Sequence, residues 1–420
     1  MTEIAAFAPP LLRQPAFRRF WVGQSVSFVG DQVSMLALPL VGVLVLDASA
    51  VEMGVLTALG WLPHLVFSLF AGEWIDRRER RRPIMIAADL GRAALLATIP
   101  LTGYLGALTI EQLYAVTFLV GTLTVFFDLC WSSFLVALVP RSQMVAAQST
   151  IMVSRSGSQI AGPSLAGALV QLLTAPAAIL ADALSFLASA VALRGVGAPE
   201  LPLERTGAEE SALRRLRDGL TFVFRQPVLR AGVACTSTLN FFTMIWFAIF
   251  VLYASRELGL GAGTIGLVLG VGAVGGLVGA LLAPRIGRLI GIGPAVAAGA
   301  VLFPAPTVLF PLAAGSEPVK VGALLAGEFL ASIGVMVFDV NQNALNVLIT
   351  PHRLRARIAG VSRFFNYGGR PLGALAGGAL GDVLGLRPAI WVGVAGSLLA
   401  VLWLLPSPML RIIDPPAEAS

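Results

Sequence analysis

Charged residues are scarce in this chain of 420 residues: they make up 12% of it, whereas 57% of the residues are hydrophobic. Soluble domains carry roughly 25% charged residues, so this composition excludes an ordinary water-soluble fold. The cationic residues form short clusters between long apolar runs, and no aromatic residues are interleaved with them. Despite the net charge of +6, this pattern argues against a nucleic-acid partner. The sequence therefore predicts a protein whose main solvent is the lipid bilayer.

Cysteine and histidine are also rare, with two residues of each. Cys130 and Cys235 each lie inside an apolar run, which favours small buried side chains over a disulfide. His64 and His352 are too few and too scattered for a metal site. The sequence has no Gly-x-x-x-x-Gly-Lys phosphate loop, and we find no nucleophile with a matching base. We therefore expect no enzyme, no direct use of ATP, no cofactor and no metal.

Long apolar runs dominate the rest of the sequence. A membrane-spanning helix needs about 20 predominantly apolar residues. Twelve segments meet this requirement, near residues 20–46, 53–72, 83–106, 110–138, 144–172, 175–194, 228–253, 262–284, 292–314, 319–349, 362–385 and 388–405. We predict an all-α polytopic membrane protein with twelve transmembrane helices.

The distribution of arginine predicts the orientation in the membrane, because cationic loops stay on the cytoplasmic side. Most arginines fall in the two tails and in the loops that follow the even-numbered spans. Loops on the opposite side hold only Arg256, Lys320 and Arg387. We therefore expect both termini in the cytoplasm.

One long polar segment, residues 195–227, divides the predicted spans six and six. Within it Leu213, Leu216, Leu220 and Phe224 recur at helical spacing. This spacing predicts an amphipathic helix that lies at the inner membrane interface.

An internal repeat supports the same division. Phe127-Asp128, followed by Pro140-Arg141, matches Phe338-Asp339, followed by Pro351-His352, at a constant offset. We predict two pseudo-symmetric six-helix bundles, residues 1–194 and residues 228–420 with the tail, joined by the linker 195–227. Repeats of this kind commonly enclose a substrate site in transporters.

The loop after the second span carries Gly72, Asp76, Arg77 and Arg81 in the order Gly-x-x-x-Asp-Arg-x-x-Arg-Arg, with Glu79 where a second glycine is usual. This loop resembles the signature of the major facilitator superfamily. The resemblance implies a conformational latch, in which the aspartate meets a helix end of the opposite half. The alternative is that the arginines only set the orientation.

Further phrases, among them Gly30-Asp31, Phe127-Asp128 and Arg217-Asp-Gly-Leu-Thr-Phe-Val-Phe224, resemble the subfamily of the enterobactin exporter and the macrolide or multidrug efflux proteins. The resemblance covers nearly the whole chain and implies proton-driven export. It also implies that the first, fourth, seventh and tenth spans line a central cavity.

Acidic residues within spans are costly and are functional candidates by default. Five are present: Asp31, Asp128, Asp182, Glu328 and Asp339. We expect Asp31, Asp128, Glu328 and Asp339 to handle protons or cations, while pairing with Arg92, Arg155, Arg363 or Arg370 is the structural alternative. By helical spacing, Glu328, Asp339 and Asn346 share one face of their span, with Asn343 one turn from Asp339.

Two further groups of residues complete the predicted site. Gly162, Pro163 and Gly167 resemble the antiporter motif of the fifth span, with small residues that permit close helix packing; ordinary packing is the alternative. Residues expected to line the cavity are Trp131, Asn240, Trp246, Asn343 and Asn346, although the aromatic ones could equally face lipid or bundle core.

We therefore predict a proton-coupled antiporter that exports drug-like, siderophore-like or lipophilic compounds. Its expected partners are protons, an amphiphilic small molecule and the lipid of a bacterial inner membrane, and we expect a monomer. The alternatives are a carrier for uptake or facilitated diffusion of a small metabolite, and a receptor or scaffold that transports nothing.

Overall fold

The computed structural model describes residues 11–76, 81–197, 212–351 and 354–412, and every regular element in these ranges is helical. The side chains of residues 68–76, 212–216, 355–357, 359 and 363 lie outside this description. The first six predicted spans match α1 (Pro15–Leu44), α2 (Ala50–Asp76), α3 (Arg82–Tyr104), α4 (Ile110–Leu138), α5 (Met144–Leu172) and α6 (Ala175–Arg194). The last six match α8 (Pro227–Arg256), α9 (Ala262–Ile290), α10 (Ile292–Leu302) with α11 (Leu309–Leu312), α12 (Glu317–Ile349), α13 (Arg355–Leu384) and α14 (Leu386–Leu399).

Local sequence explains where these helices begin. Proline occupies the first turn of α1, α3, α6, α8 and α12, where its missing N–H leaves no hydrogen bond unmade. Thr109 caps α4 by accepting a hydrogen bond from the Gln112 N–H at 3.3 Å, and Thr174 caps α6 in the same way at 3.2 Å from Ala177.

The ninth predicted span is in the expected place but is not one helix. The α10 helix ends at Leu302, a short 3-10 turn covers Ala305–Val308, and α11 follows. Pro304 and Pro306 explain the break, because proline cannot donate the backbone hydrogen bond that would continue the helix.

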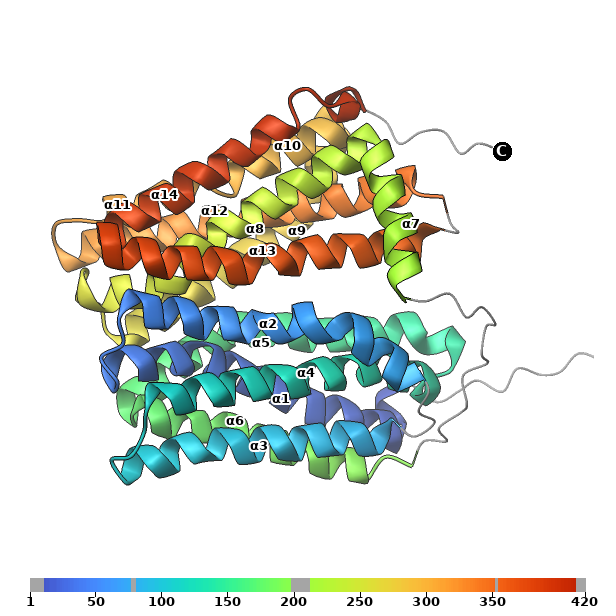
Figure 1. Cartoon of the computed structure of the whole chain (residues 1–420). Coiled ribbons are helices and arrows are strands. Elements are labelled where there is room, and N and C mark those ends of the chain that lie inside the picture. Colours follow the sequence, from blue (N-terminus) through green and yellow to red (C-terminus); the bar gives the residue numbers. More distant parts are fainter. Residues whose placement is uncertain (1–10, 77–80, 198–211, 352–353, 413–420) are drawn as a thin grey trace, which may run out of the picture.

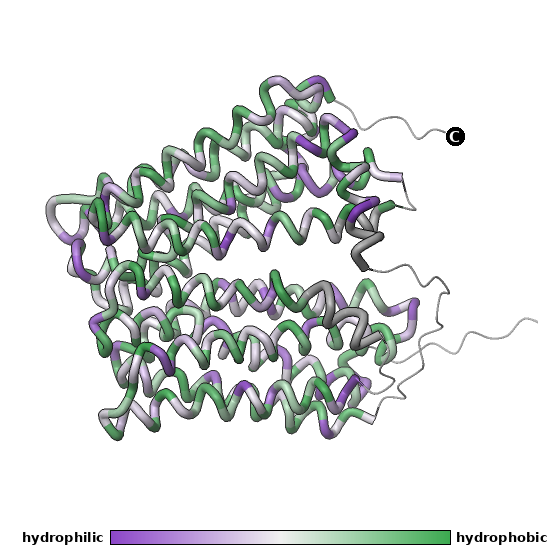
Figure 2. The backbone as a smooth tube through the Cα atoms, viewed as in Figure 1, coloured by the Kyte–Doolittle hydropathy of each residue, from purple (hydrophilic) through white to green (hydrophobic). Residues whose placement is uncertain are grey.

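Ten segments in the described part of the chain are long and apolar enough to cross a membrane. Figure 2 shows helices that are mostly green and white, with strongly hydrophilic residues frequent near their ends. The α5 and α13 helices are not among these ten, and both pack on the opposite group, α5 on α9 and α13 on α2. Helices that face protein need fewer apolar residues than helices that face lipid. The count of twelve spans stays a prediction.

The helices form two groups, α1–α6 and α8–α14 (Figure 1). One apolar core joins the groups at one end and includes Val41 and Met53 from the first group and Tyr253 and Ile265 from the second. At the other end, which carries α7 and the C-terminal residues of the described chain, the apolar cores of the two groups are separate. The structure is therefore closed at one end, which we call the closed end, and not at the other.

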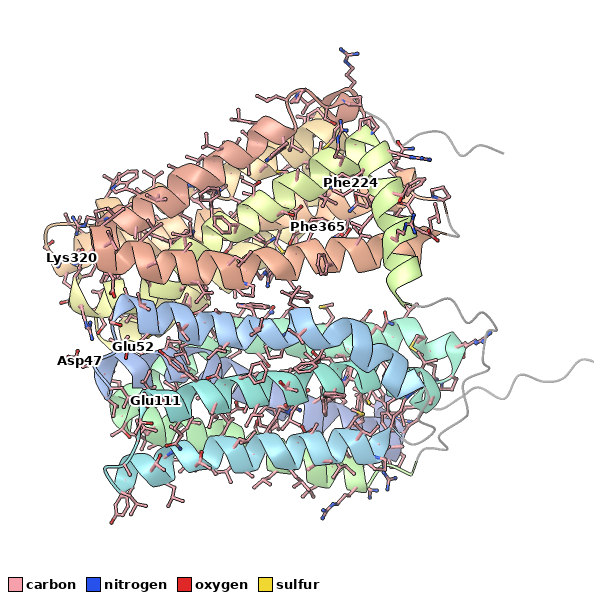
Figure 3. The ribbon with its side chains drawn as sticks, viewed as in Figure 1. Asp47, Glu52, Glu111, Phe224, Lys320 and Phe365 are labelled. Carbon is pink, nitrogen blue, oxygen red and sulfur yellow. The ribbon has the colours of Figure 1, made fainter. Side chains whose placement is uncertain are left out.

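Polar contacts also join the groups at the closed end. Arg256 Nη2 donates to Asp47 Oδ1 at 2.5 Å, and the Ala50 N–H donates to Asp382 Oδ1 at 3.2 Å. Asp47, Glu52, Glu111 and Lys320 mark this end in Figure 3, whereas Phe224 and Phe365 lie toward the other.

The predicted amphipathic helix of the linker is α7 (Ala212–Arg225). Val223 is fully buried against Leu229, Ile358 and Val361, so α7 docks on α8 and α13 of the second group. Leu220 packs against this cluster, whereas Phe224 is 53% exposed. The exact limits of the linker stay a prediction, because residues 198–211 lie outside the described residues.

Candidate functional site

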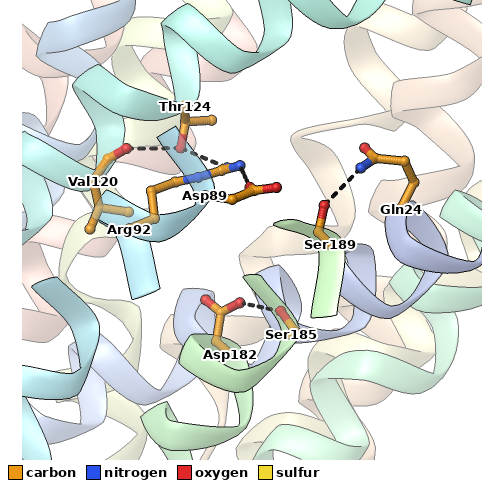
Figure 4. Close-up of polar contacts among 8 residues, drawn as sticks. All are labelled: Gln24, Asp89, Arg92, Val120, Thr124, Asp182, Ser185 and Ser189. Atoms are coloured by element: carbon orange, nitrogen blue, oxygen red, sulfur yellow. Dashed lines mark hydrogen bonds and ion pairs between the residues drawn. The ribbon is translucent and has the colours of Figure 1, made fainter. Parts of the chain in front are cut away.

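A buried ion pair lies in the middle of the first group of helices. Asp89 and Arg92 are one turn apart on α3, and the Arg92 guanidinium pairs with Asp89 Oδ1 (Figure 4). Their side chains are 0% and 3% exposed. The guanidinium also lies 4.5 Å from the Phe127 ring centre and 4.0 Å from that of Phe186, and donates to Thr124 Oγ1 at 3.4 Å. Arg92 is thus a fixed cation held by three helices, α3, α4 and α6.

A second polar group joins α1 to α6. Asp182 accepts hydrogen bonds from Ser34 and, at 3.0 Å, from Ser185. Gln24 Nε2 donates to Ser189 Oγ at 3.1 Å (Figure 4). Gly30 permits the close approach of α1 to Asp182 and Ser185, because a Cβ at position 30 would overlap both side chains. Asp182 therefore links α1 to α6 through serine hydroxyls, whereas the structural alternative from the sequence was pairing with an arginine.

Asp31 and Asp128, two of the four acids expected to handle protons or cations, differ from Asp182 because their side chains are exposed. Asp31 on α1 and Asp128 on α4 are each within electrostatic range of the other and of Arg92. Asp128 also lies within range of Arg155 on α5, whose guanidinium lies 5.9 Å from the Phe28 ring centre. Asp31 is thus within electrostatic range of Asp182, Arg92 and Asp128, a neighbourhood that the spacing in the sequence could not show.

The contribution of the Asp89–Arg92 ion pair to stability can be tested by substitution. We expect Arg92→Met to lower stability by about 3–5 kcal/mol, because it leaves Asp89 buried without its cation. The double variant Asp89→Leu, Arg92→Met should recover much of that loss, because it removes both charges. The measurement is thermal unfolding of the purified protein in detergent. Equal losses in the single and double variants would show that the pairing contributes nothing.

The second group of helices holds a polar pocket of about 160 Å³ between α8, α12 and α13. Its lining includes three of the predicted residues, Asp339, Asn343 and Asn346, as periodicity on one helix face predicted. The pocket also contains Thr236 of α8, which the sequence offers as a neutral hydrogen-bonding group. Four further polar residues of the lining were not singled out from the sequence: Ser237, Gln342, Ser362 and Asn366.

Glu328 is not part of this pocket, although it shares a helix with Asp339. Its side chain lies against Gly272 of α9, where an added Cβ would come within 2.7 Å of Oε1. The expected stripe along α12 is therefore divided between two neighbouring environments.

Asn240 on α8 lies next to the contact between the two groups. Arg370 Nε on α13 donates to Asn240 Oδ1 at 2.9 Å, and its guanidinium lies 4.2 Å from the ring centre of Trp61 on α2. Tyr367 stacks on the same Trp61 ring at 6.0 Å. Asn240 thus positions an arginine that contacts the other group, and the described pocket does not include it.

The two predicted cavity tryptophans occupy packed positions. Trp246 is 6% exposed and its ring lies 5.2 Å from that of Phe310, so it belongs to the apolar core that joins the two groups at the closed end rather than to a cavity wall. Trp131 is partly buried and packs beside Phe20, with ring centres 6.2 Å apart. Aromatic residues satisfy core and cavity equally well, which explains why sequence did not separate them.

The glycines of α5 make the close helix contact that the sequence predicted for them. A Cβ on Gly167 would lie 3.1 Å from the Cα of Gly263 on α9, and a Cβ on Gly162 would overlap Gln32 on α1. Pro163 lies inside α5 and its carbonyl faces Gly266 of α9. Pro163 and Gly167 therefore contact the second group, whereas Gly162 packs α5 on α1 within the first group. An antiport role stays a prediction.

The predicted latch loop falls largely outside the described residues. Gly72 and Asp76 lie in the final turns of α2, but their side chains are outside the description, as is all of Arg77. Arg81 precedes α3 and is 8% exposed.

Sequence reasoning missed several residues that the structure brings together. Asp89 escaped notice although its spacing of three from Arg92 is a recognisable signal for a helical ion pair. Trp61, His64 and Tyr367 form an aromatic cluster with Arg370, and no spacing within one helix could have revealed it.

Comparison with known proteins agrees with this architecture. A family model described as a transmembrane secretion effector matches residues 4–417. The chain is 25% identical to YfiS of Bacillus subtilis strain 168, an uncharacterized MFS-type transporter, over 92% of the chain and 90% of the relative. It is 27% identical to the multidrug efflux pump Tap of Mycolicibacterium fortuitum, over 85% and 87%. Macrolide efflux protein A of Streptococcus pyogenes is 25% identical over 54% and 55%.

Solved structures share the fold at lower identity. A bacterial homologue of the iron transporter ferroportin in its inward-facing state has a TM-score of 0.75 at 17% identity, covering 94% of this chain and 99% of that one. The outward-facing state of a bacterial ferroportin homologue gives 0.59 at 19% identity, covering 93% and 98%. Both likenesses show the fold of this chain.

Proposed function

Because the chain belongs to the transmembrane secretion effector family of major facilitator transporters, we propose that it is a proton-coupled antiporter. The family makes the protein a multi-pass membrane transporter and not an enzyme. We propose that its cargo is a drug-like, siderophore-like or lipophilic compound, exported from the cell.

The observation that carries the coupling proposal is the placement of Asp31 and Asp128. Each acid lies within a membrane-spanning helix, where a carboxylate is costly unless it has a role. Both side chains are exposed and lie within electrostatic range of each other, beside the buried cation Arg92. The proton affinity of a carboxylate depends on its distance from neighbouring charges, so a rearrangement of the helices around these two acids can drive uptake and release of a proton.

The proposed direction and cargo are supported by the relatives. Tap is named a multidrug efflux pump, and macrolide efflux protein A is also named for export. We propose that this chain shares their direction and a similarly broad class of amphiphilic substrate.

The proposed movement is a rocking of the two groups of helices between two states. In the described state the groups share an apolar core at the closed end and have separate cores at the other. The arginine distribution supports a cytoplasmic position for the end that is not closed, and for both termini. We propose that the protein works as a monomer in the bacterial inner membrane, because each chain holds both groups of helices.

Transport in proteoliposomes tests the proposal directly. Purified protein is reconstituted, a fluorescent lipophilic cation such as ethidium is added, and its movement is followed with and without an imposed pH gradient. We expect the gradient to drive transport against the dye concentration, and a proton ionophore to abolish it. Transport that ignores the gradient would favour facilitated diffusion. An absence of transport, both for the dye and for macrolide and siderophore probes, would contradict the proposed function.

A further inference from the structure

The polar pocket of the second group contains two buried hydrogen-bond acceptors without a donor among the described residues. Two amide oxygens, Gln342 Oε1 and Asn366 Oδ1, are buried and accept no hydrogen bond within the described part of the chain. Gln342 is 7% exposed and its own Nε2 already donates to Asn346 Oδ1 at 3.0 Å. Asp339 adds a carboxylate whose side chain is exposed in the same lining. A buried acceptor without a donor is costly, so this pocket favours a ligand that brings donors.

The packing of α12 against Gly232 of α8 fixes the position of the Gln342 side chain. A Cβ on Gly232 of α8 would overlap Gln342 Nε2 and lie 3.2 Å from its Cδ. Glycine at that position therefore makes the room in which the amide lies. Phe338 and Phe365 complete the lining with aromatic surface, on which a cation is also favoured.

The size of the pocket limits what part of a ligand it holds. Pockets for whole drug-sized ligands measure roughly 300–1,000 Å³. This one measures about 160 Å³, so it accommodates one small group while the remainder of a larger molecule extends beyond it.

We propose that this pocket is the binding site for a protonated amine that carries N–H donors, such as a primary or secondary ammonium group at one end of an amphiphilic substrate. This inference rests on the proposed transport function and adds a division of labour to it. Asp339, Gln342 and Asn366 hold the cargo in the second group of helices, while Asp31 and Asp128 handle the proton in the first. A quaternary ammonium of equal charge has no N–H to offer the two amide oxygens and binds more weakly.

Equilibrium binding with two matched probes tests the proposal without any gradient. The probes are dansylcadaverine, a fluorescent primary amine, and its N,N,N-trimethyl derivative, which has the same charge and no N–H donor. Binding to wild-type protein in lipid nanodiscs is followed by fluorescence anisotropy, with protein-free nanodiscs as the blank. We expect the primary amine to bind at least about tenfold more tightly, as hydrogen bonds to a charged donor imply. Equal affinities in the wild-type protein would overturn the proposal, whatever any variant does.

Three variants assign the preference to the pocket. Gln342→Leu and Asn366→Leu should each weaken binding of the primary amine several-fold and reduce its advantage over the quaternary probe. Asp339→Asn should weaken the binding of both probes, because it removes the negative charge and keeps the size of the side chain. The control is Gln112→Leu, which replaces an amide side chain on α4 in the first group of helices. Gln112 Nε2 donates to Thr98 Oγ1 at 3.2 Å, and its replacement should leave the affinities for both probes unchanged.

Failure of this inference is distinct from failure of the proposed function. Gradient-driven transport with equal binding of the two probes would retain the antiporter and remove the amine pocket. The opposite result is a preference for the primary amine that disappears in Gln342→Leu, in a protein that shows no gradient-driven transport. That result would retain the pocket and remove the proton coupling.

Discussion

Asp128→Asn in proteoliposomes is expected to lose gradient-driven transport and to keep substrate exchange. Asparagine has nearly the shape of aspartate but cannot take up and release a proton near neutral pH. Because Asp128 is exposed and has no salt bridge among the described residues, its replacement should leave the fold intact. The imposed pH gradient should then raise dye transport no further than it does in protein-free liposomes. Counterflow, in which labelled dye exchanges for unlabelled dye without a gradient, should continue.

Asp31→Asn should behave in the same way, because Asp31 and Asp128 lie within electrostatic range of each other. The effects of substitutions at residues that act as a unit are not additive. The double variant should therefore lose no more gradient-driven transport than the more impaired of the two single variants. The matched control is Glu111→Gln at the start of α4, whose side chain is exposed at the closed end (Figure 3). Wild-type gradient response in both single variants would remove the coupling role from these acids.

The sequence identified these two acids because a charge inside an apolar span is conspicuous whatever the fold. It left Asp182 out of the acids expected to handle protons, but it did not show which residues contact the Asp182 side chain. The difference lies in tertiary contacts: Ser34 and Ser185 both donate to Asp182, whereas Asp31 stays exposed one residue from Gly30. Helical spacing shows which face a residue occupies, but not which neighbouring helix covers that face.

The pocket in the second group shows the same limit. Periodicity along α12 correctly joined Asp339, Asn343 and Asn346, since they share one helix. Gln342 was not recognised, because its room depends on a glycine more than a hundred residues earlier in the chain. Glu328 lies outside this pocket, because its side chain packs against Gly272 of α9. Contacts between helices therefore decide the site, and a single sequence holds little information about them.

Hydropathy was more informative about the fold than about the site. It predicted the places of the long helices because lipid imposes a minimum apolar length on a span. It did not predict that the span at residues 292–314 is broken, although Pro304, Pro306 and Pro311 gave the signal. Apolarity alone does not separate a broken from a continuous segment.

Gly266→Leu should shift the protein toward a state that is open at the end now closed. A Cβ on Gly266 would overlap the Pro163 carbonyl and lie 3.0 Å from the Cα of Gly167, so α9 and α5 have no room for a larger side chain in the described state. Forcing bulk into a packed contact costs about 1–3 kcal/mol. That cost falls on the closed arrangement only, and it changes the ratio of the two states by about tenfold for each 1.4 kcal/mol.

A cysteine at the closed end reports this shift. Ala50 is 4% exposed and lies against Gly378 and Gly381 of α13, so Ala50→Cys should react slowly with a maleimide in the described state. The two native cysteines are buried and should add little background. Adding Gly266→Leu should raise the labelling rate at position 50 several-fold and slow transport, because the closed end can no longer reseal. Gly322→Leu on α12, where an added Cβ meets nothing within 4 Å, is the control. An unchanged rate in the Gly266 variant would mean that the α5–α9 contact does not hold this end closed, and that the apolar core around Met53 and Tyr253 does so without it.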